Sequence, residues 1–183
     1  LWTSPVLTPH WGATVALLRP VAGEPPHLLL GVPQAGLWSI DLVAHLVDYS
    51  VSLDAKGAAL LANDRIAILD RTARMIVVVD ATSGTEVDRM QLPNYVYEAI
   101  AAVPGDSDRV ALAVGDHLQT WNLKYHQPEG PSPNVGPGLA AGGALLAREG
   151  SNGATFYAGN GVGIWAFPTR PYEPFIFADG FEP

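Results

Sequence analysis

Short apolar runs recur along the chain, and each closes on an acidic, amide or small residue that a turn follows. The clearest is Ile76–Asp80, which is apolar at every position except its last. The runs at equivalent places are Leu37–Asp41, Ile76–Asp80, Leu118–Asn122 and Val162–Ala166. Their closing positions are 39, 42 and 44 residues apart. Short runs that recur with this spacing and end at turns predict β-strands in a repeated unit.

Three further strands accompany each closing run. A first strand of small and branched apolar residues is expected at Ala16–Leu18, Ala59–Leu61, Ala99–Val103 and Ala144–Leu146. A second strand is expected at His27–Val32, Arg65–Leu69, Arg109–Val114 and Ala154–Ala158. A fourth follows the closing run at Leu46–Leu53, Glu86–Leu92, Tyr172–Phe177 and, with a weaker pattern, Leu123–Tyr125. Four strands in roughly forty residues are the strand count and period of a β-propeller blade.

The change in polarity within each repeat favours a propeller over a two-sheet sandwich. The first strands are small and apolar, which suits the crowded axis of a ring, and the middle strands are apolar at nearly every position, as expected of strands covered on both faces. The last strands alternate, as in Glu86–Leu92, which is typical of a half-exposed edge. We therefore expect an all-β fold of about four four-stranded antiparallel blades, at residues 12–53, 57–92, 96–130 and 142–178, with a tail at 179–183.

Two arrangements of these blades are open. The chain could be the last part of a larger ring, or a complete four-bladed ring in which residues 1–7 close against residues 175–177. An open array leaves blade faces and strand edges uncovered unless a partner covers them. The absence of an initiator Met favours the partial or partner-completed ring.

The second repeat resembles a known family. Residues 76–87, Ile-Val-Val-Val-Asp-Ala-Thr-Ser-Gly-Thr-Glu-Val, resemble the strand–Asp–turn–strand core of YVTN-type and WD40-like propeller repeats. Trp121-Asn122 and Trp165-Ala166 resemble the aromatic–polar ending of a WD40 strand, although the Gly-His dipeptide of WD40 repeats is missing. The resemblance implies a propeller fold and carries no particular activity with it.

Composition and charge exclude several classes of function. The net charge is −8 and the ten basic residues are scattered, whereas nucleic-acid binding needs cations that converge on phosphates. We therefore expect no nucleic-acid partner. There is no cysteine, which excludes disulfides, Cys-ligated metals and thiol nucleophiles. No apolar run is long enough to cross a membrane as a helix, so we expect no membrane insertion.

No constellation along the chain indicates a reaction. The five histidines show no metal-ligand spacing, and no Ser lies in a Gly-x-Ser-x-Gly elbow. The glycine-rich stretch 159–163 has no following helix, and a hairpin turn explains it. Asp41, Asp80 and Asn122 recur at matching places, where a side chain that caps a turn is favoured over a catalytic or calcium-binding ring. We expect no catalytic residue, metal site or cofactor.

The topology of a blade still indicates where a partner would bind. Turns between second and third strands emerge on the same face as the links between blades, and loops on a rigid scaffold often carry binding. The residues expected on that face are Asp54, Lys56, Arg71, Arg74, Asn94, Tyr95, Asp116, His117 and Asn160. We expect a non-catalytic interaction module that assembles with a protein partner or another chain. The alternative is a hydrolase, lyase or dehydrogenase portion with an axial active site.

The end of the chain bears on its location. The tail Asp179-Gly180-Phe181-Glu182 resembles a short ending found on some secreted bacterial proteins. This resemblance implies a periplasmic or secreted protein, whereas a final outer strand and a turn at Asp179-Gly180 explain the same residues without export.

Overall fold

The structure of the protein, a computed structural model, describes residues 15–32, 34–130, 132, 134, 144–150, 153–159 and 164–168. Within these ranges the chain forms strands and no helix, arranged in four antiparallel sheets that follow one another in sequence. The first sheet contains β1 (Val15–Val21), β2 (Glu24–Val32), β3 (Gly36–Asp41) and β4 (Leu46–Val51). The second contains β5 (Ala55–Leu60), β6 (Arg65–Asp70), β7 (Met75–Asp80) and β8 (Glu86–Gln91).

The third and fourth sheets repeat this plan. The third contains β9 (Tyr97–Ala102), β10 (Arg109–Val114), β11 (His117–Asn122) and β12 (Gln127–Glu129). The fourth contains β13 (Ala144–Gly150), β14 (Gly153–Gly159) and β15 (Ile164–Pro168). In every sheet the spatial order equals the chain order, so each is a simple meander, here called a blade.

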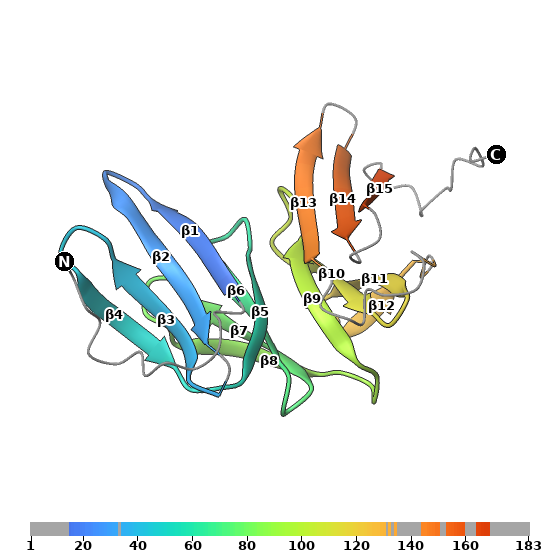
Figure 1. The fold of residues 1–183 in the computed structure, drawn as a ribbon, viewed down its shortest axis with the longest axis horizontal. Coiled ribbons are helices and arrows are strands. Elements are labelled where there is room, and N and C mark those ends of the chain that lie inside the picture. The colour runs from blue at the N-terminus through green and yellow to red at the C-terminus, as the bar shows by residue number, and fades with distance from the viewer. Residues whose placement is uncertain are drawn as a thin grey trace.

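The blades are joined through their first strands. β1 contacts β5, β5 contacts β9 and β9 contacts β13, so the first strand of each blade is the innermost one (Figure 1). Small residues permit this approach: a Cβ added at Gly57 of β5 would lie 3.0 Å from the Ile100 side chain of β9. The predicted gradient from small inner strands to polar outer strands is present in the second blade, where β6 and β7 are almost wholly buried and β8 is mostly exposed.

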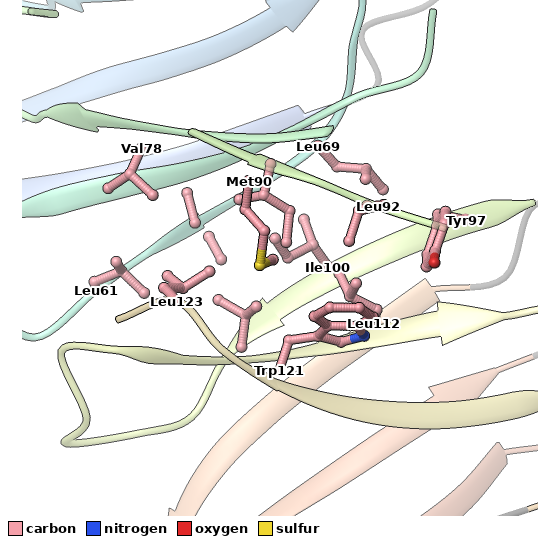
Figure 2. Close-up of a cluster of buried hydrophobic side chains, with 14 residues drawn as sticks. Leu61, Leu69, Val78, Met90, Leu92, Tyr97, Ile100, Leu112, Trp121 and Leu123 are labelled. Carbon is pink, nitrogen blue, oxygen red and sulfur yellow. The ribbon is translucent and has the colours of Figure 1, made fainter. Parts of the chain in front are cut away.

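The hydrophobic core lies between blades. We call the face that a blade turns towards the preceding blade its upstream face, and the opposite face its downstream face. Between the second and third blades, Val78 and Met90 meet Leu112 and Trp121 (Figure 2). Between the first and second, Leu29 meets a layer of branched residues that belong to the upstream face of the second blade. Phe156 of the fourth blade packs on alanines of the third.

The backbone pairing aligns the first three blades residue by residue. Asp41 lies opposite His27, Asp80 opposite Arg65 and Asn122 opposite Arg109, so the three predicted closing positions are equivalent. Side chains two residues apart on a strand share a face, so this register also identifies which residues of each blade are equivalent.

Two strand predictions are wrong. The expected closing position Ala166 pairs with Tyr157 in the middle of β15 and does not end a strand. In the third blade the outer strand is β12 at Gln127–Glu129, because Leu123 is buried in the core and the residues after it form the turn. The fourth strand expected at residues 172–177 and the tail at 179–183 lie outside the described residues.

Candidate functional site

The edge of the array that we call the link face carries the turns between second and third strands and the links between blades. Because turns alternate between the two edges of an antiparallel meander, the β6–β7 and β10–β11 turns lie on the same edge as the links at residues 52–54 and 92–96. The predicted binding residues therefore lie at or beside this edge, except Asn160, which lies outside the described residues; Lys56, inside β5, points into the joint with the third blade.

Asp54 ties three segments of the link face together. Its carboxylate accepts hydrogen bonds from the Gln34 backbone N–H at 3.1 Å and from the Thr72 hydroxyl at 2.9 Å. Arg71 donates its backbone N–H to the Asp54 carbonyl at 2.9 Å, and its guanidinium Nε lies 3.9 Å from the carboxylate. The first-to-second link is thereby held to both neighbouring turns. Asp54 thus has a structural role, because it fixes the link to the two turns, whereas the Arg71 side chain is 52% exposed.

Lys56 faces another blade. Its Nζ lies 2.8 Å from Glu98 Oε2, which joins β5 to β9 across the inner strands, and both side chains are largely buried. A buried ion pair of this kind leaves neither charge available to a ligand, and removing one partner would leave the other as an unpaired buried charge. Lys56 therefore belongs to the joint between the second and third blades.

Arg74 and Asn94 are exposed residues of the link face that contact each other. Arg74 ends the β6–β7 turn with a φ of 53°, and Asp70 caps that turn by accepting the Ala73 N–H at 2.9 Å. The Arg74 guanidinium donates to Asn94 Oδ1 on the second-to-third link. Beside Asn94 on that link are Tyr95 and Val96, whose exposed fractions are 62% and 63%.

Asp116 and His117 lie at the β10–β11 turn and form an ion pair with each other when the histidine is protonated. Asp116 also accepts a hydrogen bond from Asn134 Nδ2 at 3.1 Å, and His117 forms a β-bridge with Asn134. This pair thus anchors the segment that follows the third blade.

The recurring carboxylates do not converge. Asp41 Oδ1 accepts the Val43 and Ala44 N–H groups at 2.7 and 2.8 Å, and Asp80 Oδ1 accepts those of Thr82 and Ser83 at 3.1 and 2.8 Å. In the third blade Asn122 Oδ1 accepts the N–H of Tyr125 at 3.1 Å. Each side chain caps its own turn, so the turn-capping prediction is confirmed and the main motive for an axial active site is removed.

The caps have an electrostatic consequence. Hydrogen bonds from the backbone of Ala44 and Val43 lower the pKa of Asp41, and those from the backbone and hydroxyl of Ser83 lower the pKa of Asp80. Donors that point at a carboxylate favour its charged form. Both groups therefore stay ionised as structural acceptors.

Sequence reasoning missed a series of bonds between blades on the opposite edge. Arg19 of the first blade donates to Asp64 of the second at 3.0 and 2.7 Å, and Arg65 of the second donates to Asp108 of the third at 3.2 Å. A signal was present, because Asp-Arg dipeptides occupy residues 64–65 and 108–109, at equivalent places in two blades. The dipeptide at 64–65 accepts from the first blade and donates to the third, whereas in the dipeptide at 108–109 the aspartate accepts from the second blade and Arg109 pairs with Glu129 of its own blade at 2.9 Å.

The first blade carries a polar cluster in which His27 Nδ1 and Ser39 Oγ lie 2.8 and 2.9 Å from the same oxygen of Asp48. Among the residues with described placement, no three His, Asp or Glu side chains gather as a metal site. The same part of the chain contains no helix long and apolar enough to cross a membrane.

Comparison with known proteins identifies the fold. No protein-family model matches the sequence, and no curated protein matches it significantly. Among solved structures, hydrazine synthase from Kuenenia stuttgartiensis matches with a TM-score of 0.55 and 14% identity, over 87% of this chain and 49% of that one. Sqt1 from Saccharomyces cerevisiae matches with a TM-score of 0.61 and 11% identity, over 85% and 45%. BamB from Moraxella catarrhalis matches with 0.56 and 16%, over 81% and 41%.

Sqt1 and BamB are propellers, so the predicted β-propeller fold is confirmed. At these identities the likeness shows the fold alone. The chain spans less than half the length of each of these three structures.

Proposed function

We propose that this protein is a non-catalytic interaction module that holds a protein partner on its link face. The observation that carries the proposal is the exposure of Tyr95 and Val96, whose exposed fractions are 62% and 63%. They lie on the second-to-third link, next to Asn94, which is hydrogen-bonded to Arg74. Tyr and Arg are enriched among the hot-spot residues of protein interfaces, and here an exposed Tyr lies on the link that Arg74 contacts.

The surrounding bonds support the same conclusion. Asp54 and Asp70 fix the β6–β7 turn, and Lys56 with Glu98 fixes the inner strands behind it. A partner would therefore meet a surface whose backbone is already ordered, so binding would cost less conformational entropy. The proposed setting is outside the cytoplasm of a bacterium; fractionation of the source cells tests this point separately.

Site-specific photocrosslinking tests the proposal. A photoreactive phenylalanine analogue replaces Tyr95, and in a matched control it replaces Val87, which is 51% exposed on the outer strand β8. In cells of the source organism, position 95 should yield a discrete crosslinked protein that position 87 does not. With the purified partner, Tyr95→Ala should weaken binding by about tenfold or more. Equal crosslinking from both positions, or none from position 95, would reject the link face as the binding surface.

A further inference from the structure

The upstream face of the first blade is apolar. The described residues cover it less fully than they cover the equivalent face of the second blade. The residues of the second blade that pack on the first are Ile66, Ile68, Val77 and Val79, all at least 95% buried. By backbone register their equivalents in the first blade are Leu28, Leu30, Trp38 and Ile40. Three of these four remain partly exposed, and only Ile40 is buried.

The inner strand of the first blade shows the same contrast. Leu18 lies opposite Leu28 and shares its face, and its side chain is 62% exposed. Its equivalent in the second blade, Leu60, packs against the core between the first two blades. Leu18, Leu28, Leu30 and Trp38 therefore form a surface of the kind that the second and third blades bury beneath a preceding blade.

The other end of the array exposes the opposite kind of face. In the fourth blade Ala147 and Phe156 pack on the third blade, whereas Leu146 and Tyr157 lie opposite one another on the reverse, downstream face. Leu146 is 64% exposed. The first and fourth blades are at the two ends of the array (Figure 1). Among the described residues, one end thus carries an upstream face that is only partly covered and the other a downstream face on which Leu146 is exposed, which is the combination that joins blades inside the chain.

We infer that the upstream face of the first blade binds the downstream face of the fourth blade in a second copy of this chain. A head-to-tail contact of this kind closes into a ring when the rotation between copies permits. The chain covers 45% of Sqt1 and 41% of BamB, so two copies joined end to end have approximately the length of one such propeller chain. The inference concerns a different surface from the link face, so it can fail without the proposed function failing.

Sedimentation equilibrium of the full chain and two charge variants tests the inference. The wild type should be a dimer, and Leu18→Asp and Leu146→Asp should each weaken dimerisation by about tenfold or more, because an aspartate would be buried without a partner. Both positions are exposed, so the variants should keep the wild-type circular-dichroism spectrum. Val87→Asp, on an exposed outer strand, serves as the control and should remain dimeric.

Mixing the two variants separates a head-to-tail contact from a symmetric one. A mixture of Leu18→Asp and Leu146→Asp chains retains one intact contact, between the unaltered upstream face of one chain and the unaltered downstream face of the other, so heterodimers should appear. A monomeric wild type would overturn the inference. It would equally be overturned by a dimer that survives Leu146→Asp, since the downstream face of the fourth blade would then not take part in the contact.

Discussion

Arg19 of β1 and Asp64 of the β5–β6 turn join the first blade to the second through two N–H···O bonds, from Nε at 3.0 Å and from Nη2 at 2.7 Å. The arginine side chain is 6% exposed and the aspartate 54% exposed, so the two partners do not depend on the bond equally. Thr82 accepts a further hydrogen bond from Arg19 at 2.8 Å. The joint holds a nearly buried cation with acceptors from the next blade.

Removing Asp64 should therefore destabilise the protein more than an ordinary surface substitution. Asp64→Ala leaves a largely buried guanidinium with one neutral partner, which should cost about 1–3 kcal/mol in the free energy of unfolding, and it places Ala at a left-handed φ of 56°, which should cost about 1–2 kcal/mol more. Arg19→Met removes the charge together with its need for a partner, so in that background Asp64→Ala should cost only the backbone contribution. Urea unfolding of the wild type, the two single variants and the double variant measures the coupling energy between Arg19 and Asp64. Purely additive losses of stability would show that the bond between these two residues contributes nothing.

The turn cap at Asp80 predicts a dependence of stability on pH. Because the Ser83 donors lower its pKa in the folded protein, Asp80 stabilises the fold above the unfolded-state value of about 3.9, and this contribution disappears as the pH falls through the lower folded-state pKa. Asp80→Asn should keep the cap, as Asn122 does in the third blade, and should lose less stability between about pH 5 and pH 2.

Asp80→Ala should lower stability throughout this range, because it removes the acceptor itself. Thermal unfolding across a pH series compares the three proteins. An unchanged pH dependence in Asp80→Asn would mean that the titration of other carboxylates accounts for the acid sensitivity.

Gly84 and Tyr49 provide a test of packing between blades. Gly84 ends the β7–β8 turn with a φ of 69°, and an added Cβ would lie 2.3 Å from the Tyr49 ring, whose hydroxyl donates to the Ala81 carbonyl at 2.8 Å. Gly84→Ala should cost about 1–2 kcal/mol for the left-handed backbone and about 1–3 kcal/mol more for the clash. In a Tyr49→Ala background only the backbone cost should remain. If chemical denaturation gives the same penalty in both backgrounds, the ring does not lie over the turn.

Tyr97 carries a buried hydroxyl with no hydrogen-bond partner among the described residues, at the end of the core between the second and third blades (Figure 2). Burial raises the pKa of this phenol to about 12, so it stays neutral at ordinary pH. Tyr97→Phe removes the unsatisfied group and keeps the ring, and it should stabilise the protein by about 1 kcal/mol. A loss of stability in urea unfolding would show that the hydroxyl has a partner in solution.

The sequence was most informative where the signal is local. Asp41, Asp80 and Asn122 cap turns within three residues, so their spacing revealed equivalent strand ends. The fourth repeat has no such residue at its expected closing position, and aligning Trp165 with Trp121 placed that end in mid-strand, because an aromatic side chain can occupy several places on a blade face.

The joints between blades could not be predicted in the same way. Arg19 and Asp64 are 45 residues apart, and their bond depends on how one sheet stacks on the next. The position of the link face could be predicted from topology alone. Which of its side chains are exposed to a partner could not be predicted in this way. Lys56 looked like a surface charge, and only the approach of β9 with Glu98 turned it into an internal ion pair.

Hydroxyl-radical footprinting of the dilute, monomeric chain tests the central claim most directly, namely that each blade covers the upstream face of the next and leaves that of the first blade open. The account predicts rapid oxidation of Leu28, Leu30 and Trp38, and strong protection of their equivalents Ile66, Ile68 and Val77. Equal protection of the two sets would contradict it.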